Sequence, residues 1–111
     1  MQFQPIRISP QYALIFTYDI RPGLEQRYNQ FASGEFVMTM QQYKLYRQYE
    51  WHILGSDEPQ WQVEFITEKL SHIRDLFDDP QWPILEERLR RYTRNYARRL
   101  VRFHQNIKIM R

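Results

Sequence analysis

Residues 60–103 constrain the fold more than any other stretch, because they switch from strand periodicity to helix periodicity and back. Residues 60–67 alternate apolar and polar side chains, which is typical of a half-buried strand. From Ser71, a residue type that caps helices, apolar side chains recur at helical spacing as far as Tyr92. Residues 96–103 return to a strand pattern. The stretch therefore predicts a strand, a helix and a second strand.

The predicted helix is interrupted in its middle by the segment 78–82. Asp79 is suited to cap a new helix and Pro80 to occupy its first position, where the missing N–H costs nothing. Pro83 falls within the first turn of this restart and is tolerated there. We therefore expect two helical segments that meet at Asp79 and Pro80.

The first half of the chain repeats the order of strand, helix and strand. Residues 11–20 are rich in strand formers and apolar in both phases, which favours a central strand. A helix is predicted over 22–40, and the Ser33-Gly34 pair weakens its middle. Residues 43–54 alternate again, with aromatic and apolar side chains at most odd positions. This half therefore supplies the other two strands of a small sheet.

The two halves are joined by Gly55–Pro59, whose composition indicates a turn between antiparallel strands. The resulting order, β-α-β-β-α-β, predicts an α+β ferredoxin-like sandwich with a four-stranded antiparallel sheet and both helices on one face. We expect an extended lead-in over residues 1–10 and a single domain over residues 11–109, since 111 residues suffice for one core.

The other face of this sheet has no helix to cover it. A small domain cannot leave such an aromatic and apolar face in contact with water. We therefore expect a homodimer in which a second copy covers that face, as in a dimeric α/β barrel.

Composition removes several classes of protein. There is no cysteine, so disulfides and cysteine-based metal sites are excluded. No apolar run approaches the roughly 18 residues of a membrane span, and the first residues lack the pattern of a signal peptide. We expect a cytoplasmic protein with no membrane segment, no metal and no cofactor.

Charge is distributed unevenly along the chain. Residues 1–87 hold all 13 acidic and 7 basic residues, and residues 88–111 hold 9 basic residues and no acid. A basic terminus can bind nucleic acid or another polyanion. It can equally pair with acidic surface on the same chain or on a partner subunit, and we favour this second interpretation.

The polyanion hypothesis is the alternative function, an interaction module without chemistry. Arginine and aromatic side chains together can bind phosphates and stack on bases. The RNA-recognition fold has the same element order, but its glycine-aromatic strand signature is absent here. Nucleic acid is therefore not the favoured partner. The candidate polyanion surface consists of Arg91, Arg94, Arg98 and Arg99.

Three stretches of the sequence together carry a family resemblance. They are Arg21-Pro22-Gly23-Leu24-Glu25 after the first strand, the segment 73–82 in the second helix, and Arg99-Leu100-Val101-Arg102-Phe103 in the last strand. With them the chain resembles the dimeric α/β-barrel superfamily, and within it the antibiotic-biosynthesis-monooxygenase-like branch.

The resemblance implies ferredoxin-like subunits that pair sheet to sheet. Members range from enzymes that oxidise flat aromatic substrates with O₂ and no cofactor to enzymes that degrade haem. The haem-degrading members use an Asn, a Trp and a His where this chain has Phe16, Thr67 and Glu86. The resemblance therefore implies a monooxygenase-like or small aromatic ligand-binding protein rather than a haem enzyme.

Such a ligand would need an aromatic pocket with a polar group. Aromatic side chains on the first two strands could line it, and an arginine or histidine could stabilise a phenolate. The candidate pocket residues are Tyr18, Arg47, Tyr49, Trp51, His52 and His104. Two histidines with Glu50 and Glu64 could also hold a metal, but solvated polar residues explain that pattern as well. The sequence names no reaction.

Overall fold

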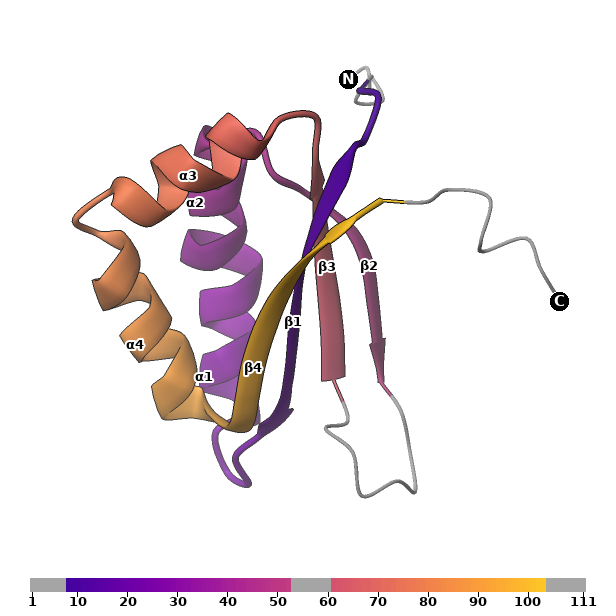
Figure 1. Cartoon of the computed structure of the whole chain (residues 1–111). Coiled ribbons are helices and arrows are strands. Elements are labelled where there is room, and N and C mark those ends of the chain that lie inside the picture. The colour runs from indigo at the N-terminus through magenta and orange to yellow at the C-terminus, as the bar shows by residue number, and fades with distance from the viewer. Residues whose placement is uncertain (1–7, 53–60, 104–111) are drawn as a thin grey trace, which may run out of the picture.

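The computed structural model describes residues 8–52 and 61–103, with backbone alone for residues 49–52. Its helices and strands are β1 (Tyr12–Ile20), α1 (Glu25–Phe31), the π-helical turn η1 (Ala32–Phe36), α2 (Val37–Gln42), β2 (Tyr46–His52), β3 (Trp61–Thr67), α3 (Leu70–Asp78), α4 (Trp82–Tyr92) and β4 (Thr93–Arg102). The strands form one antiparallel sheet in the order β2-β3-β1-β4. The helices lie together on one side of it (Figure 1).

This arrangement is the predicted ferredoxin-like α+β fold. The first strand, apolar in both phases, lies between β3 and β4 as expected for a central strand. The predicted hairpin is confirmed by the antiparallel pairing of β2 with β3. The turn predicted at 55–59 lies outside the described residues.

Strand register sorts the side chains between two faces. Leu14 aligns with Phe65 and Leu100, and these positions face the helices. Ile15 aligns with Glu64 and Arg99, one step along each strand, so these positions face the other way. We call the side away from the helices the outer face.

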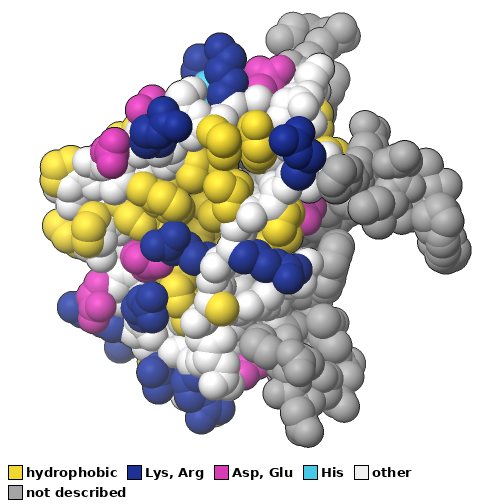
Figure 2. All heavy atoms as spheres, viewed as in Figure 1, with side chains coloured by type: hydrophobic (Ala, Val, Ile, Leu, Met, Phe, Trp, Pro, Cys, Tyr) yellow, Lys and Arg dark blue, Asp and Glu magenta, His cyan; other side chains and the backbone are white. Residues whose placement is uncertain are grey.

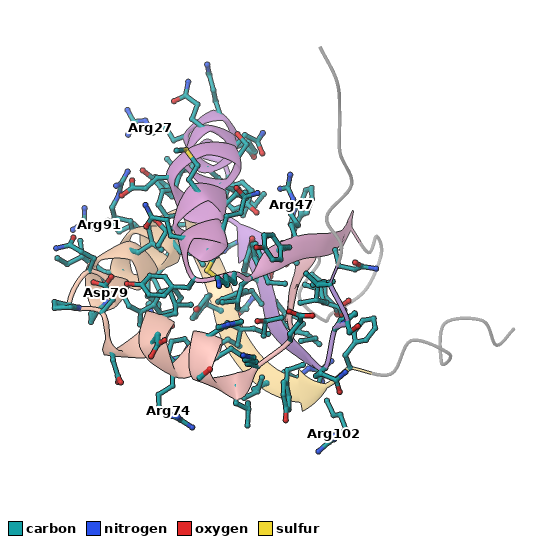
Figure 3. All side chains as sticks on the ribbon, turned by 90° about the horizontal axis from the view of Figure 1, so that it is seen from above. Arg27, Arg47, Arg74, Asp79, Arg91 and Arg102 are labelled. Atoms are coloured by element: carbon teal, nitrogen blue, oxygen red, sulfur yellow. The ribbon has the colours of Figure 1, made fainter. Side chains whose placement is uncertain are left out.

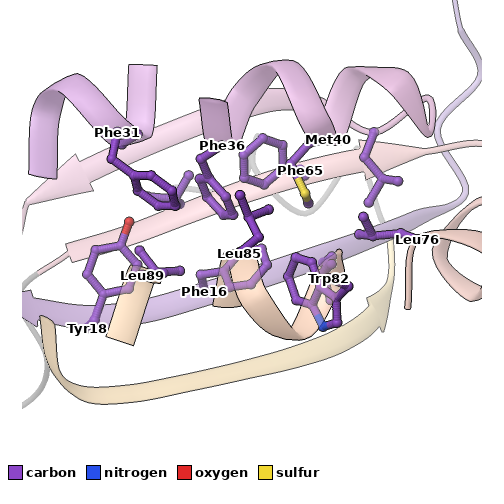
Figure 4. Packing of buried hydrophobic residues seen from close by; sticks show 14 of the residues in the cluster. Phe16, Tyr18, Phe31, Phe36, Met40, Phe65, Leu76, Trp82, Leu85 and Leu89 are labelled. Atoms are coloured by element: carbon purple, nitrogen blue, oxygen red, sulfur yellow. The ribbon is translucent and has the colours of Figure 1, made fainter. Parts of the chain in front are cut away.

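The core lies between the sheet and the helices and is built largely from aromatic rings (Figure 4). Phe16 is fully buried at its centre, with edge-to-face contacts to Phe36 at 5.4 Å and to Phe65 at 5.9 Å between ring centroids. Such pairs contribute about 0.5–1.5 kcal/mol each beyond the burial of their area. The high aromatic content of the sequence therefore serves first to fill this core.

The outer face carries a second, smaller apolar cluster. Ala13, Ile15 and Ile66 are buried there. Partly buried side chains pack around them, namely Ile8, Tyr46, Val101 and Phe103. The apolar part of the outer face thus spans all four strands.

The helix predicted over 22–40 forms as α1, η1 and α2, with the π-helical turn at the Ser33-Gly34 pair. It ends beyond Met40 in a turn that closes with hydrogen bonds from Lys44 N–H to Gln41 O and from Leu45 N–H to Met40 O, both within 3.0 Å. These are the two bonds of a Schellman motif. Lys44 takes the left-handed conformation, with a φ of 63°.

This turn overturns the predicted start of the second strand, which begins at Tyr46 rather than at residue 43. The register of β2 also shifts between Arg47 and Tyr49. Arg47 aligns with helix-facing Phe65, whereas Tyr49 aligns with Glu64 of the outer face. The backbone register of this strand against β3 therefore shifts at a bulge, which sequence alternation cannot reveal.

In the second half, the prediction that Ser71 caps the helix is wrong. α3 begins at Leu70 with Lys69 as its N-cap residue, and no side chain caps it. The predicted interruption of the second helix is confirmed, but the new helix, α4, begins at Trp82, two residues later than predicted. Asp79 precedes it and accepts a 2.8 Å hydrogen bond from Gln81 N–H. Pro83 lies in its first turn, as predicted.

The last strand begins at Thr93, three residues before the predicted start at Tyr96. Thr93 is buried and donates a 2.8 Å hydrogen bond to Leu89 O, which closes the helix while the strand begins. Asn95, with a φ of 56°, lies where the pairing with β1 shifts register between Thr17 and Asp19. A bulge thus lets the strand follow the helix directly.

Candidate functional site

Tyr18, the first predicted pocket residue, is fully buried on the helix side of β1. Its hydroxyl shares a hydrogen bond with that of Tyr28, and its ring stacks on Tyr96 at 6.4 Å and 18°. The structure therefore places this side chain within the packed core.

Of the other predicted pocket residues, Arg47 is the one whose side chain the structure describes. Arg47 is exposed on the helix side and aligns through Phe65 with Leu14, four positions along β1 from Tyr18. That is about 13 Å at the rise of a strand. Only the backbone registers of three residues are described: Tyr49 aligns with Glu64, Trp51 with Gln62 and His52 with Trp61. His104 lies outside the described residues.

The predicted polyanion residues also divide between the faces. Arg98 aligns with Phe16 on the helix side, where its Nε donates to Glu86 Oε2 at 2.8 Å and its guanidinium lies 4.4 Å from the Phe77 ring centroid. Arg99 aligns with Ile15 on the outer face. Consecutive strand residues point in opposite directions, so these two arginines cannot contact one polyanion side by side.

Arginine and lysine side chains form several separate groups on the face shown in Figure 2. Arg27, Arg47, Arg74, Arg91 and Arg102 project outward in different directions in Figure 3. On the face shown in Figure 2, the cations thus do not form one continuous strip of the kind that binds a nucleic-acid backbone.

The favoured interpretation, pairing with acids of the same chain, is confirmed for several arginines. Arg88 pairs with Glu35 from 53 positions away, and Arg91 approaches Glu87 at 3.9 Å. Glu86 accepts bonds from Arg98 at 2.8 Å and from the Tyr96 hydroxyl at 2.7 Å, and Arg90 lies 4.0 Å from it.

The pKa values of Glu86 and Tyr96 are shifted in directions that do not favour proton transfer. Burial would raise the pKa of the Glu86 carboxyl, but hydrogen bonds from Arg98 and Tyr96 outweigh it and lower the pKa below its usual 4.5. Burial, and then the bond to Glu86, raises the pKa of the Tyr96 phenol. A general acid or base works best with a pKa near the working pH. This cluster therefore fastens β4 to α4 rather than exchanging protons.

A groove of about 470 Å³ opens between α4 and the helix formed by α1 and η1, and we call it the helix groove. It is lined by Arg27, Gln30 and Phe31 of α1, Glu35 of η1, and Arg88 and Tyr92 of α4. The rings of Phe31 and Tyr92 meet at its floor, 5.6 Å apart and tilted by 53°. The guanidinium of Arg88 lies 4.9 Å from the Phe31 ring centroid.

Each helix supplies this groove with the same pair of side chains. Arg27 precedes Phe31 by four positions, and Arg88 precedes Tyr92 by four, so each arginine lies one turn before an aromatic on the same helix face. Sequence reasoning used the aromatics only as core residues. The repeated arginine-aromatic spacing on two helices was the signal that could have revealed the groove.

Two classes of site are absent from the described part of the chain. No three His, Asp or Glu side chains there gather closely enough to hold a metal ion. Within residues 8–52 and 61–103, every helix is too short or too polar to cross a bilayer.

Comparison with known proteins places the chain by fold. No protein-family profile matches the sequence, and no curated protein does either. An uncharacterised NIPSNAP domain protein from Burkholderia xenovorans is 18% identical over 81% of this chain and 91% of its own, with a TM-score of 0.60. A NIPSNAP family protein with unknown function from Agrobacterium tumefaciens is 13% identical over 85% and 88%, with a TM-score of 0.59.

A dimeric ferredoxin-like protein from an uncultured marine organism is also similar, with 9% identity over 86% of this chain and 90% of its own and a TM-score of 0.58. Identities this low carry information about architecture and none about chemistry. The three neighbours and the sheet topology together show that this chain has the ferredoxin-like fold.

Proposed function

We propose that this chain is a homodimeric binding protein for a small, flat aromatic acid, and that the acid binds in the helix groove. The observation that carries the proposal is that Arg27 and Phe31 of α1 and Arg88 and Tyr92 of α4 line one groove, in which the rings of Phe31 and Tyr92 are in contact. The family resemblance implies a small aromatic ligand, and the two arginines of the groove add the acid group.

The groove has the size and the chemistry for such a ligand. Its volume of about 470 Å³ falls in the usual range for small-molecule sites. A guanidinium is planar and matches a carboxylate with two parallel hydrogen bonds, and it also stacks on aromatic rings. A ring lying along Tyr92 would bring its carboxylate to Arg88 and Arg27.

Glu35 competes with the ligand for Arg88, since the two side chains form an ion pair at the rim. Both are partly exposed, at 38% for Arg88 and 51% for Glu35, so the pair is weak and an incoming carboxylate can replace it. Glu35 belongs to the π-helical turn, and such turns are frequent at functional sites. The π-helical turn therefore determines the position of the Glu35 carboxylate that competes with the ligand.

The proposal leaves out oxygenation, the narrower reading of the resemblance. Cofactor-independent oxidation needs a group that accepts a proton from the substrate near neutral pH. The pKa of Glu86 is lowered and that of Tyr96 is raised, so neither member of this hydrogen-bonded pair is suited to that transfer. The proposal therefore assigns binding and no chemical step.

The ligand assignment is tested by titrating the ¹⁵N-labelled protein with benzoate and with cyclohexanecarboxylate, which has the same charge but no aromatic ring. We expect benzoate to shift the amide signals of Phe31 and Tyr92 and to bind more tightly. Arg88→Gln should weaken benzoate binding about tenfold, the cost of one charge-assisted contact.

The matched control is Arg91→Gln, the same change on the same helix at a side chain that is 69% exposed and does not line the groove. It should bind benzoate as the wild type does. Equal binding of the two acids, or equal losses in Arg88→Gln and Arg91→Gln, would remove the basis of the assignment.

The homodimer rests on the outer face. Its buried residue Ile15 is flanked in register by Glu64 on β3 and Arg99 on β4. A two-fold axis that runs parallel to β1 above Ile15 would place Glu64 of each subunit opposite Arg99 of the other. The similar marine protein is described as dimeric.

Sedimentation equilibrium tests this dimer. We expect a dimer in the wild type and dissociation in Arg99→Glu, which would place like charges across the two-fold axis. Arg74→Glu is the control, because Arg74 projects from α3 on the helix side (Figure 3). A wild-type protein that stays monomeric at every concentration tested would overturn this part of the proposal.

A further inference from the structure

A second concave site lies between the end of α2 and the start of α3, apart from the helix groove; we call it the lysine pocket. Its volume is about 460 Å³, and it is lined by Gln42, Tyr43, Lys44, Lys69, Ser71, His72 and Asp75. The two chain segments that form it are brought to the same end of the molecule by the fold (Figure 1).

The basic residues that line this pocket are lysines, whereas most basic residues of the chain are arginines. Of the 16 basic residues, only three are lysines, at positions 44, 69 and 108, and the other 13 are arginines. Two of the three line this one pocket. Arginine and lysine both bind phosphates, and the lysine ammonium does so as a compact point charge with three rotatable donors.

His72 is held in place at the pocket by a buried partner. Its Nδ1 lies 2.7 Å from the hydroxyl oxygen of Thr67, and Thr67 is fully buried. When this hydroxyl donates to Nδ1, the proton of the neutral ring sits on Nε2, which is then a donor. The pocket therefore offers an oriented imidazole beside two ammonium groups and the hydroxyl of Ser71.

One acid, Asp75, lines the pocket, and a second, Asp79, forms hydrogen bonds outside it. The Asp79 carboxylate accepts hydrogen bonds from the Tyr43 hydroxyl and from Gln81 N–H, which lower its pKa, and Asp79 does not line the pocket. Asp75 does line it. A carboxylate repels a phosphate but accepts hydrogen bonds from hydroxyl groups, so Asp75 and Gln42 favour a ligand with hydroxyls beyond its phosphate.

We propose that the lysine pocket binds a small phosphomonoester that carries hydroxyl groups, with Lys44, Lys69, Ser71 and His72 holding the phosphate. The volume is too large for a phosphate ion alone and falls in the range of small-metabolite sites. This site is separate from the helix groove, so neither proposal depends on the other.

The test uses glucose 6-phosphate, inorganic phosphate and glucose as probes, each titrated into the ¹⁵N-labelled full chain. We expect glucose 6-phosphate to bind most tightly and to shift the amide signals of Lys44, Lys69, Ser71 and His72. Inorganic phosphate should bind more weakly at the same residues, and glucose should leave them unchanged. Tighter binding of inorganic phosphate than of glucose 6-phosphate would overturn the assignment to a phosphomonoester.

Two variants remove the charges singly, Lys44→Asn and Lys69→Gln. Asparagine tolerates the left-handed backbone that Lys44 adopts, so the first variant keeps the turn. Each change should weaken glucose 6-phosphate binding about tenfold, as expected for one charge-assisted contact.

The matched control is Arg74→Gln, which removes one positive charge from α3 at a residue that does not line the pocket. It should leave the affinity within about twofold of the wild type, because the change is not in contact with the ligand. An equal loss in Arg74→Gln would mean that net charge alone attracts the probe. Unchanged binding in Lys44→Asn and Lys69→Gln, or amide shifts spread over the arginines of α4 and β4, would overturn the proposal.

Discussion

Glu86 is the residue through which the last helix holds the last strand. Its carboxylate is 14% exposed and takes hydrogen bonds from Tyr96 and Arg98 of β4. Arg98 in turn lies over the rings of Phe77 and Trp82. A partly buried carboxylate with charged and phenolic donors is a strong anchor, and its loss would leave Arg98 without its counter-charge.

Replacement of Glu86 should therefore destabilise the protein in a pH-dependent way. We expect Glu86→Gln to lower the free energy of unfolding by about 1–3 kcal/mol at pH 7. The folded-state pKa of Glu86 lies below its usual 4.5, so its contribution is fully present above pH 4.5 and is lost as the pH falls through the folded value. Urea denaturation at several pH values should show the difference between variant and wild type narrowing in acid.

The control for this prediction is Glu87→Gln on the same turn of α4. Glu87 and Arg91 are 60% and 69% exposed and 3.9 Å apart, so this pair should contribute less than about 1 kcal/mol. A constant difference between Glu86→Gln and the wild type from pH 7 to pH 3 would show that the carboxylate charge is not what matters.

At the scale of elements, the helix predicted as one piece contains a turn of a different kind. The π-helical turn spans Ala32–Phe36 and includes the Ser33-Gly34 pair. A π turn holds one more residue than an α turn, which rotates the following side chains on the helix surface. Both Phe31 and Phe36 thereby reach the core, where their rings stack at 5.7 Å.

Two glycines should respond in opposite ways to alanine. A Cβ at Gly34 would meet no atom within 4 Å, and its backbone is helical, so Gly34→Ala should raise the free energy of unfolding by about 0.5–1 kcal/mol. Gly23 has equally open surroundings, but its φ is 86°, so Gly23→Ala should be destabilising by about 1–2 kcal/mol. Urea unfolding of both variants checks this; a stabilised Gly23→Ala would contradict the backbone argument.

The edge strand β4 explains why the end of the chain is rich in arginine. An edge strand exposes backbone groups that can pair with other chains, and charged side chains discourage such pairing. Arg94, Arg98, Arg99 and Arg102 all lie on β4, which is at the edge of the sheet. This structural role accounts for four of the nine basic residues in 88–111.

At the scale of the whole molecule, stability depends on a single aromatic core centred on Phe16. Its ring contacts those of Phe36, Phe65, Trp82 and Tyr96. Those four residues come from η1, β3, α4 and β4. Both the helices and the sheet therefore contact this one side chain, and a substitution of Phe16 should affect the packing of the whole domain.

Phe16→Ala should lower the free energy of unfolding by about 3–5 kcal/mol, the usual cost of removing a buried aromatic side chain. Small domains are stable by about 5–15 kcal/mol in all, so little stability would remain. Phe16→Leu retains much of the volume and should lose about half as much. Thermal unfolding followed by circular dichroism measures both, and a small loss in Phe16→Ala would show that the core can collapse around the gap.

The order of the elements and the central place of β1 could be read from the sequence, because alternation with periods of 2 and 3.6 is a local property of the chain. The restart of the second helix at Asp79 was readable for the same reason. The exact ends were not: Ser71 has capping chemistry, yet the helix begins at Leu70, and the residues 43–45 have strand propensity, yet they complete the turn after α2. Packing against neighbouring elements decided those positions.

The faces of the strands and both concave sites were decided only by tertiary structure. A bulge after Arg47 shifts the backbone register of β2 against β3, and a shift of one residue is invisible in an alternating sequence. Arg88 meets Glu35 across 53 positions, and Lys44 lines a pocket with Lys69 across 25. Local patterns specify which elements form, but only their packing brings distant side chains into one site.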